Sequence, residues 1–62
     1  MNMSVCKLAH KTYLSEIEYL EKLRDKIHTL RPGSKEMKFY IMELEHTQIG
    51  IGELKDYMDG EC

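Results

Sequence analysis

Apolar residues recur along the first half of the chain at the three- and four-residue spacing of an amphipathic helix. From residue 6 to residue 30 they follow a single heptad seam, which Glu16 interrupts and Ile17 widens. Ser4 precedes this seam in the place of an N-terminal cap. The pattern predicts a helix over about residues 4–30, with the seam Cys6, Ala9, Tyr13, Leu20, Leu23, Ile27 and Leu30.

A turn and a second helix are predicted after the first seam ends. Residues 31–34 read Arg-Pro-Gly-Ser; proline disfavours helix at the preceding residue, and Pro-Gly suits the centre of a type II turn. Ser34 can cap the next helix, Glu36 lies in its first turn, where the helix dipole favours an anion, and Gly60 can end it. These signals predict a helix over about residues 35–59. Its seam is Met37, Tyr40, Leu44, Ile51, Leu54 and Met58, with Ile41 beside it and a weak point at Thr47.

Two glycines, Gly50 and Gly52, lie inside this second helix. Each costs a helix interior about 1 kcal/mol relative to alanine. Either the helix continues in a weakened form, or it kinks or breaks there. Leu44, Ile51 and Met58 keep a spacing of seven across both glycines, which favours the continuous helix. The glycines would then leave room for the backbone of a neighbouring subunit.

Together these elements predict an all-α fold, with one antiparallel helical hairpin forming a single domain over residues 1–62. A hairpin of this length buries one stripe per helix and has little core, so further apolar residues need cover. We therefore expect a homodimer that forms a four-helix bundle, although scattered exposed apolar residues are also normal on any protein. The surplus residues are Phe39, Met42 and Ile49 in the second helix and Leu8, Leu14 and Tyr19 in the first.

Composition narrows the cellular setting. The chain is 42% hydrophobic and 32% charged, which is too apolar for a disordered segment. It has no run of about 18 apolar residues and no basic-then-apolar start typical of a secretory signal, so we expect a cytoplasmic protein with no membrane partner. Cytoplasmic thiols are normally reduced, so Cys6 and Cys62 are expected to be free, although antiparallel helices would bring them close together.

Charge is distributed unevenly along the chain. Residues 22–38 hold six Lys or Arg side chains against two acidic ones, whereas residues 53–62 hold four acidic side chains against Lys55. A first alternative function is therefore RNA or DNA binding by the turn end, since small dimeric helical hairpins that bind structured RNA exist. That analogy concerns architecture alone. The residues that would meet phosphates are Lys22, Lys26, Arg31, Lys35 and Lys38.

A second alternative is a metal-binding bundle. Glu43 and His46 form a Glu-x-x-His motif, which some four-helix proteins combine with glutamates of other helices to bind two iron or manganese ions. Glu18 is among the nearest carboxylates of the first helix, and the ions would have to lie at a dimer interface because His46 is off the seam. Cys6, His10, Asp59 and Cys62 also offer zinc-like ligands, without a supporting Cys-x-x-Cys pair.

No glycine-rich phosphate loop, nucleophilic triad frame or dinucleotide fingerprint occurs in the sequence, so we expect neither an enzyme nor a cofactor. The leading hypothesis is a small protein-interaction module: a regulator, inhibitor or adaptor that binds an unidentified protein. Short chains of this kind are frequent among regulators of phages and mobile elements. Methionine and aromatic side chains suit adaptable contacts. The expected partner-binding residues are Phe39, Met42, His46 and Ile49, with Leu14 and Tyr19 as neighbours.

Overall fold

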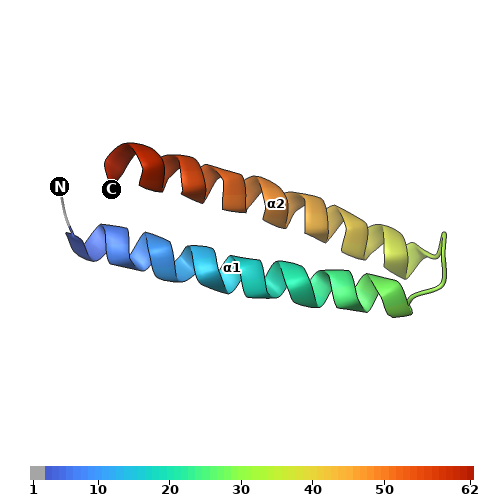
Figure 1. Ribbon diagram of the computed structural model, residues 1–62. Coiled ribbons are helices and arrows are strands. Elements are labelled where there is room, and N and C mark those ends of the chain that lie inside the picture. Colours follow the sequence, from blue (N-terminus) through green and yellow to red (C-terminus); the bar gives the residue numbers. More distant parts are fainter. Residues whose placement is uncertain (1–2) are drawn as a thin grey trace.

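The protein is an antiparallel hairpin of two helices in a computed structural model that describes residues 3–62 (Figure 1). Helix α1 spans Met3–Thr29 and helix α2 spans Lys35–Glu61, each with 27 residues. The helices lie side by side, so that the start of α1 and the end of α2 lie at one end of the hairpin and the turn forms the other (Figure 1). The hairpin measures 47 × 14 × 12 Å. The predicted all-α helical hairpin is confirmed.

The turn follows the predicted chemistry. Gly33 has a φ of +79°, the left-handed conformation that a type II turn requires at its third residue. The Ser34 amide donates to the Arg31 carbonyl oxygen at 3.1 Å and closes the turn. The Ser34 hydroxyl then accepts a 3.1 Å hydrogen bond from the Met37 amide, which caps α2. The predicted cap and the first-turn position of Glu36 are therefore confirmed.

The outer helix ends differ from the sequence-based expectation. Helix α1 begins at Met3, so Ser4 lies inside its first turn instead of capping it. Helix α2 runs past Gly60 to Glu61, because the Cys62 amide donates to the Met58 carbonyl oxygen at 2.9 Å and extends the helical bonding by one more step. Gly60 therefore does not end the helix.

Helix α2 passes through Gly50 and Gly52 without a break, which confirms the continuous helix. A Cβ atom added to either glycine would meet nothing within 4 Å. No neighbour within the hairpin therefore requires glycine at these two positions. The role of the glycines in the approach of a second subunit stays a prediction.

The core between the helices is thin. Within residues 4–62, whose side chains the structure describes, only Ala9, Leu23 and Thr47 are less than 9% exposed, and none is fully buried. The other seam residues of both helices are half-buried, as is Ile17. Thr47, the predicted weak point, is tolerated because its hydroxyl donates to the Glu43 carbonyl oxygen one turn back, at 2.8 Å.

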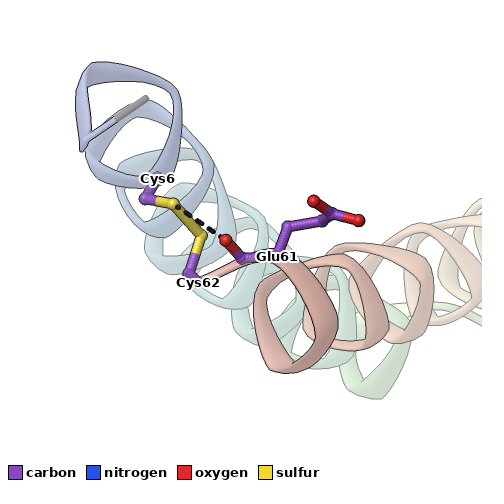
Figure 2. Close-up of a disulfide and its surroundings, with 3 residues drawn as sticks. All are labelled: Cys6, Glu61 and Cys62. Carbon is purple, nitrogen blue, oxygen red and sulfur yellow. Dashed lines mark hydrogen bonds between the residues drawn. A yellow bond between two sulfur atoms is a disulfide. The ribbon is translucent and has the colours of Figure 1, made fainter. Parts of the chain in front are cut away.

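A disulfide joins Cys6 and Cys62 at the open end of the hairpin (Figure 2). The expected free thiols are therefore wrong. The antiparallel register brings the two Cα atoms to 5.9 Å, within the range that a disulfide spans, although 56 positions separate them in sequence. The Cys6 sulfur also lies 3.8 Å from the Glu61 carbonyl oxygen, and this is a contact only, since an oxidised sulfur has no proton to donate. The cross-link also removes the thiolates that the zinc-like ligand set would need.

Candidate protein-interaction surface

Large apolar side chains cover much of the outside of the hairpin. Phe39 is 62% exposed, Ile49 60% and Met42 58%, which are values expected for polar surface residues. His46 is exposed as well. Within the described side chains the exposed large apolar residues are Val5, Leu8, Leu14, Tyr19, Phe39, Ile41, Met42, Ile49 and Tyr57.

Four of the expected partner-binding residues share one side of α2. Phe39, Met42, His46 and Ile49 follow one another at steps of three, four and three, which places them within about 80° around a helix that turns 100° per residue. We call these four residues the α2 stripe. All four are exposed, so the stripe faces away from the seam with α1. The Phe39 ring packs edge-on against Tyr40, with ring centres 5.5 Å apart, and this contact connects the stripe to the seam.

Tyr19 reaches the same region from α1. Its hydroxyl donates to Oε1 of Glu43 at 3.4 Å, and Glu43 lies one helical turn from both Phe39 and His46. Desolvation, and after it the Glu43 carboxylate, raise the pKa of the Tyr19 hydroxyl above its ordinary value. Leu14, by contrast, lies five residues before Tyr19, about 140° around α1. The structure therefore brings Tyr19 to the stripe and places Leu14 on another side of the hairpin.

The Tyr19–Glu43 contact marks one flank of the hairpin. Seven-residue steps from Tyr19 and Glu43 lead to Thr12 and Gly50 and then to Val5 and Tyr57, because a heptad step returns almost to the same side of a helix. Leu8, Ser15 and Phe39 lie one turn from these positions. We call this side the Tyr19 flank. Its apolar residues are Val5, Leu8, Tyr19, Phe39 and Tyr57, its small residues are Thr12, Ser15 and Gly50, and its charged residues are Glu43 and, one heptad step toward the turn, Lys26 and Glu36.

The two flanks of the hairpin differ in character. The Tyr19 flank holds five of the nine exposed large apolar residues. The opposite flank lies across the seam from Tyr19 and Glu43. Most of its residues are polar or basic: His10, Ile17, Arg24, Ile41, Gln48 and Lys55. Sequence reasoning named Leu8 as surplus but overlooked Val5 and Tyr57. Val5 and Tyr57 share the heptad positions of Tyr19 and Glu43 beside the seam. The sequence shows this spacing, but it identifies a common flank only once the rotation of both helices about the seam is known.

The exposed area is larger than a chain of this size normally leaves. The accessible surface is 5039 Å², whereas a compact monomer of 7.3 kDa is expected to expose about 4,200 Å². The difference is roughly 840 Å². A standard protein–protein interface covers about 800 Å² on each partner. The accessible surface of the hairpin thus exceeds that of a compact monomer by about the area that one partner buries in a standard interface.

Charge separates along the long axis of the hairpin. Residues 22–38, which surround the turn, carry six Lys or Arg against Asp25 and Glu36, a formal charge of +4. The remaining residues carry three Lys against nine acidic side chains, a charge of −6. The five lysine and arginine residues expected to meet phosphates are all exposed around this basic end. The basic turn end and the acidic open end make each hairpin electrostatically polar.

The metal-binding alternative gains no cluster within one hairpin. In residues 3–62, no three His, Cys, Asp or Glu side chains come together in a way that could hold a metal ion. Glu43 accepts a hydrogen bond from the Tyr19 hydroxyl. Glu18 lies exposed on α1, one residue before Tyr19. Glu18, Glu43 and His46 therefore do not converge in a single chain.

The surface of the described chain has no pocket, and no helix in it is both long enough and apolar enough to cross a bilayer. Comparison with protein-family models, curated proteins and solved structures finds no match to this chain.

Proposed function

We propose that this protein is a small non-enzymatic interaction module, a homodimeric helical hairpin that regulates, inhibits or adapts another protein. The observation that carries this proposal is the roughly 840 Å² of surplus surface together with the exposed α2 stripe. A chain that exposes Phe39, Met42 and Ile49 in water gains free energy when another surface covers them.

The chemistry of the stripe suits a protein partner. Met42 is flexible and polarizable, so it can fill an irregular apolar surface, and Phe39 supplies a large rigid anchor. His46 lies between Met42 and Ile49 along α2 and adds a polar contact. A partner of matching chemistry presents an apolar groove or helix face with an acceptor for the imidazole. No step of this proposal needs a cofactor.

The proposal is tested by partner capture from the native host. The wild-type hairpin is expected to retain a specific protein that Ile49→Asp loses, since a carboxylate cannot be buried in an apolar contact without a partner. Gln48→Asp is the matched control, because it places the same new charge one residue away, about 100° around α2. Equal capture by Ile49→Asp and wild type would refute a role for the stripe.

We further propose the cytoplasm as the place of action. The structure has the Cys6–Cys62 disulfide, and reducing conditions in the cytoplasm would convert it to the dithiol, so this proposal requires the module to work with its open end unlinked. Partner capture is therefore expected to persist in the presence of a dithiol reductant. Capture that is lost on reduction would place the protein in an oxidising compartment instead.

The exposed basic end supports a second candidate function, binding of RNA or DNA. Five exposed Lys or Arg side chains near one turn can neutralise phosphates, and such binding weakens steeply with salt. Lys35→Glu is expected to weaken it uniformly across sequences, whereas Lys55→Glu, at the acidic end, is the control. Absence of binding at low salt would exclude this candidate.

A further inference from the structure

We infer that a second copy of the chain covers the Tyr19 flank, and that the two hairpins lie antiparallel, with the turn end of one beside the open end of the other. This inference rests on the homodimer of the proposed function and deepens it by naming the flank and the orientation. It assigns the Tyr19 flank to pairing, so Phe39 contacts the second copy rather than another protein, and Met42, His46 and Ile49 of the α2 stripe remain available to that protein.

Surface area and residue type select the flank. The surplus of roughly 840 Å² per chain equals what each member of a standard dimer buries. The Tyr19 flank holds most of the exposed large apolar side chains and contributes both helices to one face. A pair of hairpins joined through it has four helices around a shared interior. Of the exposed large apolar side chains in the described residues, the opposite flank holds Ile41 alone.

Charge selects the orientation. A parallel pair would place two ends of charge +4 next to each other and leave the acidic ends together. An antiparallel pair places each basic turn end beside an acidic open end. Like charges at close approach destabilise an interface and opposite charges stabilise it, so the antiparallel arrangement is favoured.

The placement of small residues agrees with this orientation. The chain turns at residues 32 and 33. An α1 residue therefore lies level with the α2 residue for which the two residue numbers add up to about 65. Ser15 and Gly50 are therefore level with each other, close to the middle of the flank, and Thr12 is one turn away. A two-fold axis within a turn of this level lets the two copies approach closely, since a Cβ at Gly50 has open space above it in the single hairpin.

The same two-fold relation pairs the bulky residues. Leu8 and Tyr57 are level with each other near the open end. A two-fold axis level with Gln48, two residues to the turn side of Gly50, lies nine residues from both Tyr57 and Phe39 along α2. The symmetry brings Phe39 of one copy against Leu8 and Tyr57 of the other. Met42 and Ile49 stay at the rim of this contact, where a different protein can reach them.

The test uses the unmodified protein, with isotope-labelled and unlabelled chains mixed into one dimer. Phe39 is the only phenylalanine, so its ring signals are unambiguous. Intermolecular nuclear Overhauser effects are expected from the Phe39 ring to the Leu8 methyl groups. Intermolecular contacts from Phe39 to residues of the partner's turn end would show a parallel dimer and overturn the orientation, and a monomer at about 1 mM would overturn the pairing.

A matched pair of leucines tests the flank independently. Leu8 lies on the Tyr19 flank and Leu14 lies off it, and both are exposed leucines of α1. Leu8→Asp is expected to weaken dimerisation at least about tenfold, and Leu14→Asp less than about twofold. Equal effects would overturn the choice of flank. Partner capture with Ile49→Asp is read separately, so a monomer that still captures its partner removes the pairing and leaves the interaction module standing.

Discussion

The hydroxyl of Tyr19 on α1 donates a hydrogen bond to Oε1 of Glu43 on α2, at 3.4 Å. This contact identifies the flank on which Leu8, Phe39 and Tyr57 also lie. It also joins Tyr19 of α1 to a residue of α2 that lies one helical turn from Phe39 and His46 of the α2 stripe. The surface of the hairpin thus has one flank suited to association and one suited to water.

The Tyr19–Glu43 contact predicts a pH effect. Glu43→Gln keeps an acceptor oxygen but removes the charge, so the raised pKa of Tyr19 should fall toward its ordinary value, with the part caused by desolvation remaining. A raised folded-state pKa stabilises the protein below the unfolded-state value near 10, and this stabilisation is lost as the pH rises further. Carbon-13 NMR titration of the tyrosine rings measures the shift. A Tyr19 titration unchanged in Glu43→Gln would contradict this account.

The Cys6–Cys62 link predicts a large effect of reduction on stability. The cross-link closes a loop of 56 positions, and loop entropy gives about 4 kcal/mol of stabilisation for that length. Denaturant unfolding with and without a dithiol reductant should show a decrease approaching this value. The double variant Cys6→Ser with Cys62→Ser serves as a control, because reductant should leave it unchanged. A midpoint that reduction does not move would show that the link contributes nothing.

Gly50 and Gly52 of α2 are expected to differ in their effect on pairing. Alanine at either position meets no neighbour within the hairpin and has the better helix propensity, so each substitution should stabilise the helix by about 1 kcal/mol. Gly50 lies at the centre of the Tyr19 flank, whereas Gly52 is about 160° further around α2. Gly52→Ala should therefore leave dimerisation unchanged, and Gly50→Ala should weaken it. Sedimentation equilibrium measures the dimer dissociation constant of each variant. Equal dissociation constants would contradict the role given to Gly50.

The seam position of Thr47 is expected to accept an apolar residue without loss of stability. The Thr47 hydroxyl is satisfied by the Glu43 carbonyl oxygen, which also belongs to the helix ladder, so Thr47→Val leaves no buried group unpaired. The added methyl group should raise the free energy of unfolding by about 1 kcal/mol. Thr47→Ser, which keeps the hydroxyl and removes a methyl group, should lower it. A destabilised valine variant would show that the hydroxyl has a role beyond its own helix.

Much of the fold was predictable because local signals agree with one another. Pro32 and Gly33 specify the turn, Ser34 caps α2, and the heptad spacing identifies the half-buried residues on both helices. The continuous helix across Gly50 followed from the unbroken phase of the seam. The α2 stripe was predictable for the same reason, since it depends on the phase of one helix alone.

The remaining features depend on how the two helices meet. The Tyr19–Glu43 contact needs the phase of both helices together, which a seam on each does not supply. The free thiols were expected from an argument about compartment, although the antiparallel geometry favoured a bond between Cys6 and Cys62. Gly60 resembles a helix cap in sequence, but the amide of Cys62 continues the helical hydrogen bonding beyond it.

The central claim is that one hairpin exposes more apolar surface than it can leave in water. The most direct measurement is the solution mass of the wild-type protein by sedimentation equilibrium at about 100 µM, where a standard interface is occupied. The account predicts a particle of twice the 7.3 kDa chain mass and unfolding that depends on concentration. A 7.3 kDa particle that unfolds cooperatively at the same temperature at every concentration would contradict it.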